Sequence, residues 1–110
     1  MKVLVVVARR YNGHELWTSL GILQRNDIEF DVVSTRTSIE DEVTGRRNKI
    51  TLTLDDVRPD QVETYDGLIF ISGNMKDTEL YWSHPTTQAY VEEAKRVDMP
   101  MAAICCSVPT

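Results

Sequence analysis

The stretch Met1-Lys-Val-Leu-Val-Val-Val-Ala8 decides the fold that the sequence predicts. Val3 to Val7 is an unbroken run of valine and leucine, which is typical of a parallel strand covered by other elements on both faces. The run follows a single Lys2 and continues into Ala8-Arg9-Arg10 without a small-residue cleavage site, so it does not resemble a signal peptide. We therefore predict that Val3 to Val7 forms a central strand of a buried sheet.

Downstream of this strand the chain alternates between helical and extended patterns. Leu16, Leu20 and Leu23 follow helical spacing, which predicts an amphipathic helix that begins near Gly13. Ile28 to Ser34 then alternates apolar and acidic residues, as a partly exposed strand does. Together these segments form a first right-handed strand-helix-strand crossover.

The rest of the chain supplies the other elements of an α/β domain. The predicted elements are a turn at Thr44-Gly45, a short strand within Lys49–Leu54, a loop or single helical turn over Asp55–Asp60, strands at Gly67–Ile71 and Met101–Ile104, and a helix from Pro85 to about Val97. The order strand, helix, strand, short strand, strand, helix, strand indicates a flavodoxin-like three-layer sandwich with a mostly parallel sheet.

Composition and charge narrow the class of protein. The 110 residues carry 12 basic and 17 acidic side chains, a net charge of -5, and this pattern does not indicate a surface that follows nucleic-acid phosphates. No run approaches the roughly 20 apolar residues that a membrane-spanning helix needs. Two adjacent cysteines cannot build a disulfide framework, so a reducing compartment fits better. We predict a cytoplasmic protein without nucleic-acid or membrane partners.

Three strand ends carry residues that point to nucleophilic catalysis, because the carboxyl ends of parallel strands share the edge where open α/β sheets bind ligands. Cys105 directly follows the last strand, and a thiol at a turn into a helix gains from the helix N-terminus, which lowers its pKa. Glu15, near the start of the first helix, can share a proton with this thiol, either as a protonated hydrogen-bond donor or as an ionised base. Backbone amides at Gly73-Asn74 and at Cys106 are candidates for an oxyanion hole.

Each of these residues also has a structural interpretation. Free cysteine is among the most buried residue types. Glu15 fits as a favourable charge in the first turn of a helix, and Gly73 fits as a turn glycine. His84 before Pro85 is typical of a residue that starts a helix. His14 and Glu15 with the cysteines lack any recognised metal-ligand spacing, so the sequence predicts neither a metal nor a cofactor.

The same residues resemble a known family. Met1 to Ala8, Glu15-Leu16, the Ile71-Ser-Gly-Asn74 turn and Met101-Ala-Ala-Ile-Cys105 look like the ThiJ/PfpI family of the class I glutamine amidotransferase-like superfamily, in the expected order. The resemblance implies a flavodoxin-like sandwich, a nucleophile-elbow cysteine at Cys105, a hydrogen-bonded glutamate at Glu15, and homodimers or larger assemblies. Because the chain stops shortly after the elbow, we expect residues 1–110 to be the first portion of a single ThiJ/PfpI-like domain whose C-terminal part is missing.

Departures from the family pattern bear on the activity. Protease-like and glyoxalase-like members carry a histidine directly after the nucleophile, and this chain has Cys106 there. Ser107-Val108-Pro109 replaces the common Gly-Pro that follows, and Ser72-Gly73-Asn74 replaces the Pro-Gly-Gly of the oxyanion turn. Because a Cys-His pair cannot form in the usual manner, these changes disfavour classical protease activity.

Three functions fit these residues. In the first, the protein is a cysteine-dependent hydrolase or lyase, similar to amidases or glyoxalases, that acts on a small carbonyl or amide-like substrate through Cys105 with Glu15. In the second, it is a redox-responsive or chaperone-like protein without enzymatic activity, in which Cys105 is oxidised to a sulfinic acid or forms a disulfide with an external thiol. In the third, it is a catalytically silent scaffold with a buried cysteine. The identity of the substrate is not encoded in a readable way, because one fold supports many chemistries.

Overall fold

A computed structural model of the protein describes residues 1–8, 10–11, 13–35, 37–41, 44–50, 52–71 and 84–104, with the backbone alone at 10, 14, 15, 103 and 104. Its centre is a five-stranded sheet in the order β6-β3-β1-β7-β8, in which every neighbouring pair is parallel. The strands are β1 (Lys2–Val7), β3 (Glu29–Ser34), β6 (Leu52–Thr53), β7 (Gly67–Ile71) and β8 (Met101–Ile104). The prediction of a mostly parallel sheet with the Val3–Val7 run at its centre is confirmed.

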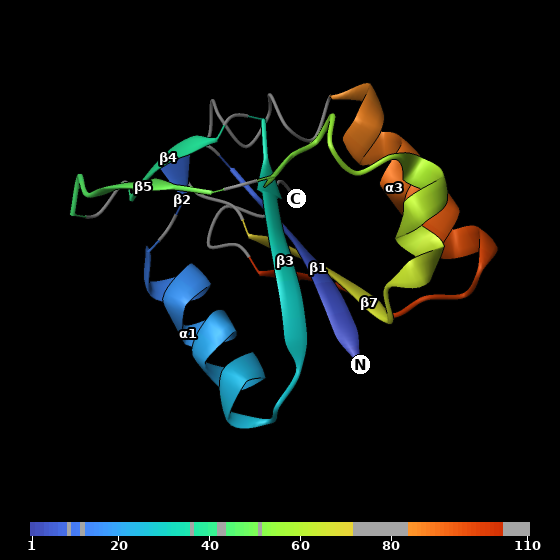
Figure 1. The fold of residues 1–110 in the computed structure, drawn as a ribbon, viewed down its shortest axis with the longest axis horizontal. Helices are drawn as coiled ribbons and strands as arrows, with labels where there is room; N and C mark the ends of the chain where they lie inside the picture. The colour runs from blue at the N-terminus through green and yellow to red at the C-terminus, as the bar shows by residue number, and fades with distance from the viewer. Residues whose placement is uncertain are drawn as a thin grey trace.

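Helices cover both faces of this sheet, which gives the predicted three layers (Figure 1). Helix α1 (Gly13–Arg25) lies on one face, and the 3-10 helix η1 (Pro59–Thr64) and helix α3 (Pro85–Arg96) lie on the other. Alternate side chains of β1 enter two separate cores. Val3, Val5 and Val7 lie against the leucines of α1, whereas Leu4 and Val6, with Ala8 just after the strand, lie on the side of α3. Burying each such side chain stabilises the fold by about 1.5–3 kcal/mol, so β1 contributes to both cores at once.

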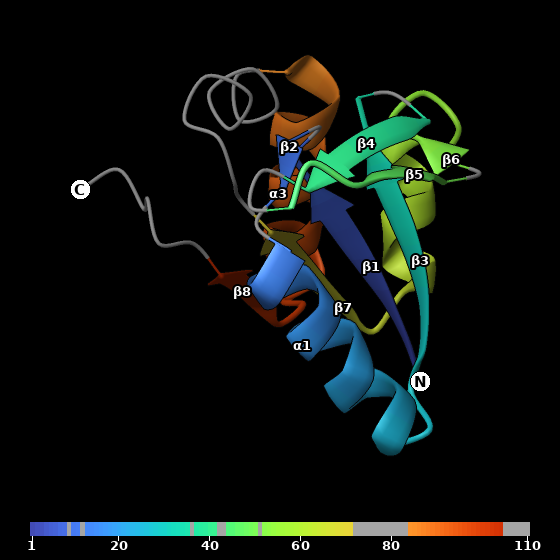
Figure 2. The ribbon, with the colours of Figure 1, turned by 90° about the vertical axis from the view of Figure 1, so that its left-hand side faces the viewer.

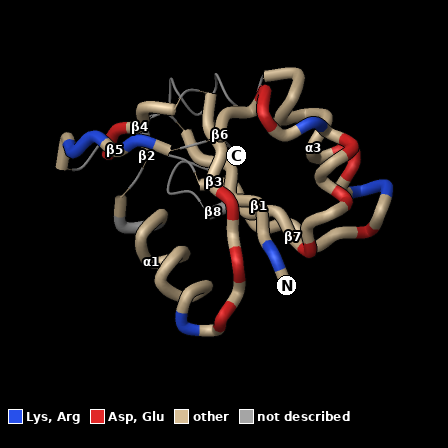
Figure 3. Tube along the Cα trace, viewed as in Figure 1, with Lys and Arg blue, Asp and Glu red and all other residues tan. Residues whose placement is uncertain are grey.

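A second, smaller sheet was not predicted. It contains β2 (Arg10–Tyr11), β4 (Ser38–Asp41) and β5 (Arg47–Lys49) in the order β2-β4-β5, with β2 parallel and β5 antiparallel to β4. It lies above the start of α1, beyond the carboxyl end of β1 (Figures 1 and 2). Basic residues gather on its outer strand (Figure 3), where charged side chains discourage pairing of an exposed edge with another chain.

The short strand predicted over Lys49–Leu54 is confirmed at Leu52–Thr53, as β6, but it does not cover the whole segment, because the two ends belong to different sheets. Lys49 is the last residue of β5, and the Ile50 amide donates to the carbonyl of Thr37 at 2.7 Å, which completes the small sheet. Leu52 then pairs with Val33 in the large sheet. The helical turn expected within Asp55–Asp60 begins only at Pro59, as η1, because proline favours the first position of a helix.

The boundaries of α3 agree with the prediction from its sequence. His84 is the N-cap residue, and its Nδ1 accepts a hydrogen bond from the Thr86 amide at 3.1 Å, so the helix-starting role predicted for it is confirmed. After Arg96 the chain turns through Asp98, whose φ of 56° is left-handed, and the Met99 amide donates to the Ala94 carbonyl at 2.8 Å. The chain is thereby directed into β8.

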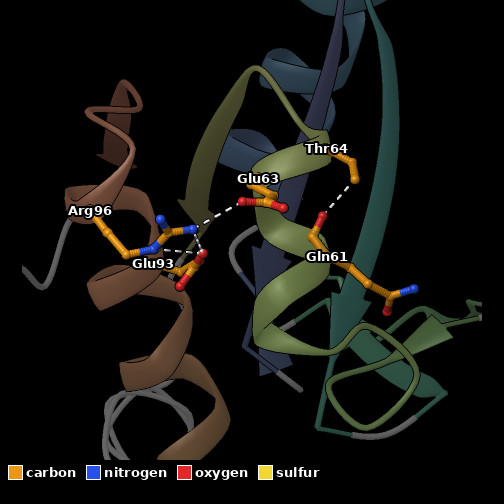
Figure 4. A network of polar contacts seen from close by, with 5 residues as sticks. All are labelled: Gln61, Glu63, Thr64, Glu93 and Arg96. Carbon is orange, nitrogen blue, oxygen red and sulfur yellow. Dashed lines mark hydrogen bonds and ion pairs between the residues drawn. The ribbon is translucent and has the colours of Figure 1, made fainter.

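Two polar contacts tie α3 to the rest of the fold in different environments. The buried Tyr90 hydroxyl shares its single hydrogen between the carbonyls of Leu54 and Val57, at 3.0 and 2.5 Å, and so anchors the loop before η1. On the surface the Arg96 guanidinium binds Glu93 of its own helix and Glu63 of η1, the latter at 2.9 Å (Figure 4). The first contact satisfies carbonyls that water cannot reach, whereas the second competes with solvent.

Helix α1 begins where the buried carboxylate of Asp41 meets Gly13. The Gly13 amide donates to Asp41 Oδ1 at 3.2 Å, which satisfies one of the four amides left free at a helix N-terminus. A Cβ atom added to Gly13 would overlap the Asp41 carboxylate, so a larger residue at this position requires the Asp41 side chain or the backbone to shift. By contrast, a Cβ on Gly21, inside the same helix, would meet no atom within 4 Å.

We expect Tyr90→Phe to lower the free energy of unfolding by about 1–3 kcal/mol, because it removes the hydroxyl hydrogen that the buried carbonyls of Leu54 and Val57 share. Arg96→Met removes a surface ion-pair network instead and should change the urea midpoint little, with any change lost at high salt. Urea denaturation of both variants at low and high salt measures this. A larger loss for Arg96→Met than for Tyr90→Phe would contradict the assignment.

The two glycines of α1 predict opposite effects of the same substitution. Gly13→Ala should lower the free energy of unfolding by about 1–3 kcal/mol, because the added methyl group overlaps the Asp41 carboxylate. Gly21→Ala should raise it by about 0.5–1 kcal/mol, because alanine has less conformational freedom to lose in a helix. Chemical denaturation of the pair provides the comparison, and equal stability of the two variants would show that Asp41 does not contact Gly13 closely.

Candidate functional site

The carboxyl ends of three strands meet in one row at the edge of the large sheet. Val7 is the register partner of Ile71, and Ile71 is the partner of Ile104. Because neighbouring strands lie about 4.8 Å apart, β1 and β8, one on each side of β7, end about 10 Å from each other. The residues that follow these three strands therefore start from the same level of the sheet.

This row lies at the point where the chain changes direction across the sheet. From β1 the chain passes to β3 on one side, and it later returns to β7 on the other side of β1. Loops that leave in opposite directions open a crevice outside the strand ends, and open α/β sheets bind their ligands there. The topology thus selects the edge beside Val7 and Ile71 as the candidate site.

Hydrogen bonds fix the end of β1 beyond its last ladder pair with β3. The Ala8 amide donates to the Ile71 carbonyl at 3.0 Å, which extends the contact with β7. On the other side the fully buried Ser34 hydroxyl donates to the Val7 carbonyl at 2.7 Å, so a side chain replaces the missing ladder bond. The end of β1 is therefore hydrogen-bonded on both sides, which fixes the position from which the chain leaves the sheet.

The small sheet holds the chain between β1 and α1. Tyr11 is fully buried, its register partner is Asp41, and its hydroxyl accepts a hydrogen bond from Asn48 Nδ2 at 2.6 Å. Burial raises the pKa of Tyr11 above its ordinary value against the effect of the Asn48 hydrogen bond, and the charge of Asp41 raises it further. Tyr11 thus stays neutral near the strand edge, and its ring contacts Trp17 edge-on at a centroid distance of 6.2 Å.

The structure describes the backbone of one predicted site residue, Glu15, and the other predicted site residues lie outside its described part. The backbone of Glu15 lies in the first turn of α1, as predicted, while its side chain is outside the described part. Cys105, Cys106 and Gly73-Asn74 lie outside the described residues. Their roles as nucleophile and oxyanion-binding amides stay predictions. The described chain brings together the row of strand ends that precedes Gly73 and Cys105. The helix that carries Glu15 begins at Gly13, six positions after the end of β1 at Val7.

Asp41 is the residue near this edge that the sequence did not single out. It is 5% exposed and contacts the start of α1, 28 positions earlier in the chain. The sequence contains only a weak signal, an Asp in a polar segment between two strands, and no local pattern pairs it with Gly13.

Within the described residues no three histidine, cysteine, aspartate or glutamate side chains gather as metal ligands would. No helix in the same part of the chain is long and apolar enough to cross a membrane.

Comparison with known proteins agrees with this architecture. An uncharacterised protein of Methanocaldococcus jannaschii, MJ0967, is 28% identical over 107 residues, which are 96% of this chain and 50% of that protein. The oxidised DJ-1 of Toxoplasma gondii superposes with a TM-score of 0.82 at 27% identity, over 96% of this chain and 56% of that one. The DJ-1 of Schizosaccharomyces pombe has a TM-score of 0.82 at 20% identity, over 96% and 58% of the two chains.

The chain spans about half the length of these relatives, 50% of the archaeal protein and 56% of the Toxoplasma protein. The family model of the DJ-1/PfpI family matches residues 1–110. With the parallel sheet order, the glutamate-bearing helix turn and the aligned strand ends, this match shows that the chain belongs to the DJ-1/PfpI family.

Proposed function

We propose that the protein is a cysteine-dependent hydrolase or lyase of the ThiJ/PfpI type, in which Cys105 attacks a small carbonyl or amide-like substrate and Glu15 handles the proton. The observation that supports this most is the register row Val7, Ile71 and Ile104. Cys105 is the next residue after this row, and Glu15 lies two residues after the start of α1. Both are therefore connected by short, anchored backbone to the same edge of the sheet.

In the proposed reaction the Cys105 sulfur forms a bond to the carbonyl carbon, and the electron pair of the double bond moves to the oxygen. The backbone amides of Gly73, Asn74 and Cys106 would hold that oxyanion. An ionised Glu15 takes the thiol proton, whereas a protonated Glu15 donates a hydrogen bond to a thiolate that formed earlier. With an amide substrate, the amine leaves with a proton from Glu15, and water hydrolyses the thioester that remains.

A redox function of the same cysteine is the second candidate. Two points favour it: the Toxoplasma relative is a DJ-1 in an oxidised state, and Cys106 stands where the family resemblance implies a histidine in protease-like and glyoxalase-like members. Here peroxide is the oxidant, and Cys105 passes through a sulfenic acid to a sulfinic acid, which carries two added oxygen atoms.

Three further predictions accompany the proposal. Residues 1–110 form the first portion of one DJ-1/PfpI domain, in keeping with the half-length match to the relatives. The protein acts in the cytoplasm. It assembles as a homodimer or larger homo-oligomer.

The enzymatic proposal predicts that Cys105→Ser abolishes turnover of small aldehydes or amides, with a loss on the order of a thousandfold or more in kcat/KM, as expected when a nucleophile is removed. Glu15→Gln should also lower kcat. Glu29→Gln, at the amino end of β3 and far along the strand from the site, is the matched control. Circular dichroism establishes that each variant is folded, and unchanged turnover in folded Cys105→Ser would exclude the mechanism.

Treatment with mild peroxide, followed by fragment-ion mass spectrometry, separates the two candidates. Selective addition of two oxygen atoms at Cys105, in a protein whose Cys105→Ser variant loses no turnover, would favour the redox function. If Cys105 is neither needed for turnover nor oxidised before Cys106, the silent scaffold is the correct interpretation.

A further inference from the structure

The small sheet contains a buried carboxylate, that of Asp41, which has no role in the proposed reaction. Asp41 ends β4, and it is 5% exposed although aspartate is rarely buried. Burying an ionised carboxylate is costly unless hydrogen-bond donors surround it. The amide of Gly13, the first residue of α1, is one such donor.

The contact between Asp41 and Gly13 is close. The hydrogen bond of 3.2 Å joins the start of α1 to the end of β4. The carboxylate also occupies the place where a side chain on Gly13 would begin, so glycine is what allows this approach. The negative charge further stabilises the helix N-terminus through the helix dipole.

Both sides of this contact are themselves anchored. The Asp41 amide donates to the Arg46 carbonyl at 2.9 Å, and the Asp41 carbonyl accepts from the Gly45 amide at 2.7 Å, which closes the β4-β5 turn through a left-handed glycine with φ of 73°. On the other side, Tyr11 pairs with Asp41 in register and is buried. Asp41 is therefore part of a rigid support, and Gly13 follows an anchored strand by two residues.

We infer that Asp41 is a positioning residue for Glu15: through Gly13 it fixes where the first turn of α1 stands relative to the strand edge, and with it the carboxyl group that shares a proton with Cys105. Glu15 lies two residues after Gly13 in that turn. The inference rests on the proposed function, since it needs Glu15 to act on Cys105. A displacement of a catalytic group by about 1 Å can lower a rate on the order of 100-fold, so a fixed helix start has a direct effect on the reaction.

A purely structural role of Asp41 would give a different pattern of coupling. If Asp41 only stabilised the fold, its removal would lower stability and would act on the thiol independently of Glu15. If it acts through Glu15, its effect on the thiol disappears once Glu15 no longer shares the proton. A double-mutant cycle measures this difference, because independent effects add and effects through a shared group do not.

The test combines Asp41→Ala and Glu15→Gln, singly and together, in the full-length protein. The readouts are kcat with a small aldehyde and the pH dependence of Cys105 alkylation by iodoacetamide, located by fragment-ion mass spectrometry. Asp41→Asn retains an oxygen that can accept from Gly13 and should recover most of the rate. Asp66→Asn is the matched control, because Asp66 also accepts a backbone amide, that of Lys2 at 2.9 Å, but at the amino end of the strands.

We expect Asp41→Ala to lower kcat by about 10- to 100-fold and to shift the apparent thiol pKa, with less than about twofold further effect in the Glu15→Gln background. If Asp41→Ala fails to fold, Asp41→Glu, which moves the carboxylate by one methylene, replaces it in the cycle with a smaller expected loss. Additive effects, or a folded Asp41→Ala variant with wild-type kcat and thiol pKa, would overturn the inference alone. If Glu15→Gln itself changes neither readout, the proposed function fails and the inference fails with it.

Discussion

Parallel hydrogen bonding of β1 to a strand on each side is the constraint on which the rest of the structure depends. Residues of β1 pair with β3 and with β7 along most of its length, and its alternate side chains are buried in both cores. A strand so enclosed can change direction only at its ends. The carboxyl end is therefore the place where the chain opens toward solvent, between loops that leave for opposite sides of the sheet.

The small sheet fixes the chain between β1 and α1, which the large sheet does not contact through its ladders. Beyond Val7 the ladder between β1 and β3 is finished, and the Ser34 hydroxyl substitutes for one bond of it. Farther along, β2 pairs with β4, and the Asp41 carboxylate receives the start of α1. A chain that leaves a buried strand is thus held at successive points until the helix that carries Glu15 begins. The added sheet positions the helix, and its Tyr11 and Ile39 are buried in the core on the side of α1.

Patterns that repeat along a segment were predictable from the sequence, and contacts between distant segments were not. The Val3–Val7 run and the leucine spacing of α1 each repeat one type of environment, so burial alone defined those elements. The small sheet consists of strands of two to four residues, too short to show periodicity. Lys49–Leu54 was expected to be one strand, whereas its ends pair with different partners and only Leu52–Thr53 joins the large sheet.

The candidate site, too, was predictable from the sequence only in part. Glu15 was placed correctly on the first helical turn because that turn follows from the position of the strand before it. The juxtaposition of Asp41 with Gly13 depends on the route of the chain through residues 35–60, which no local signal describes. The chemistry of the residue types was enough to predict Cys105 and Glu15 as reactive groups. The contact of Asp41 with the start of α1 could be found only in the structure.

The distance between Cys105 Sγ and the nearest carboxyl oxygen of Glu15, in a crystal structure of the full-length protein, tests the central claim most directly. If the aligned strand ends bring the two residues to one site, the atoms lie within hydrogen-bond reach, about 3.5 Å or less. A Cys105 side chain packed in the core, with neither direct contact nor a shared water between it and Glu15, would contradict the account.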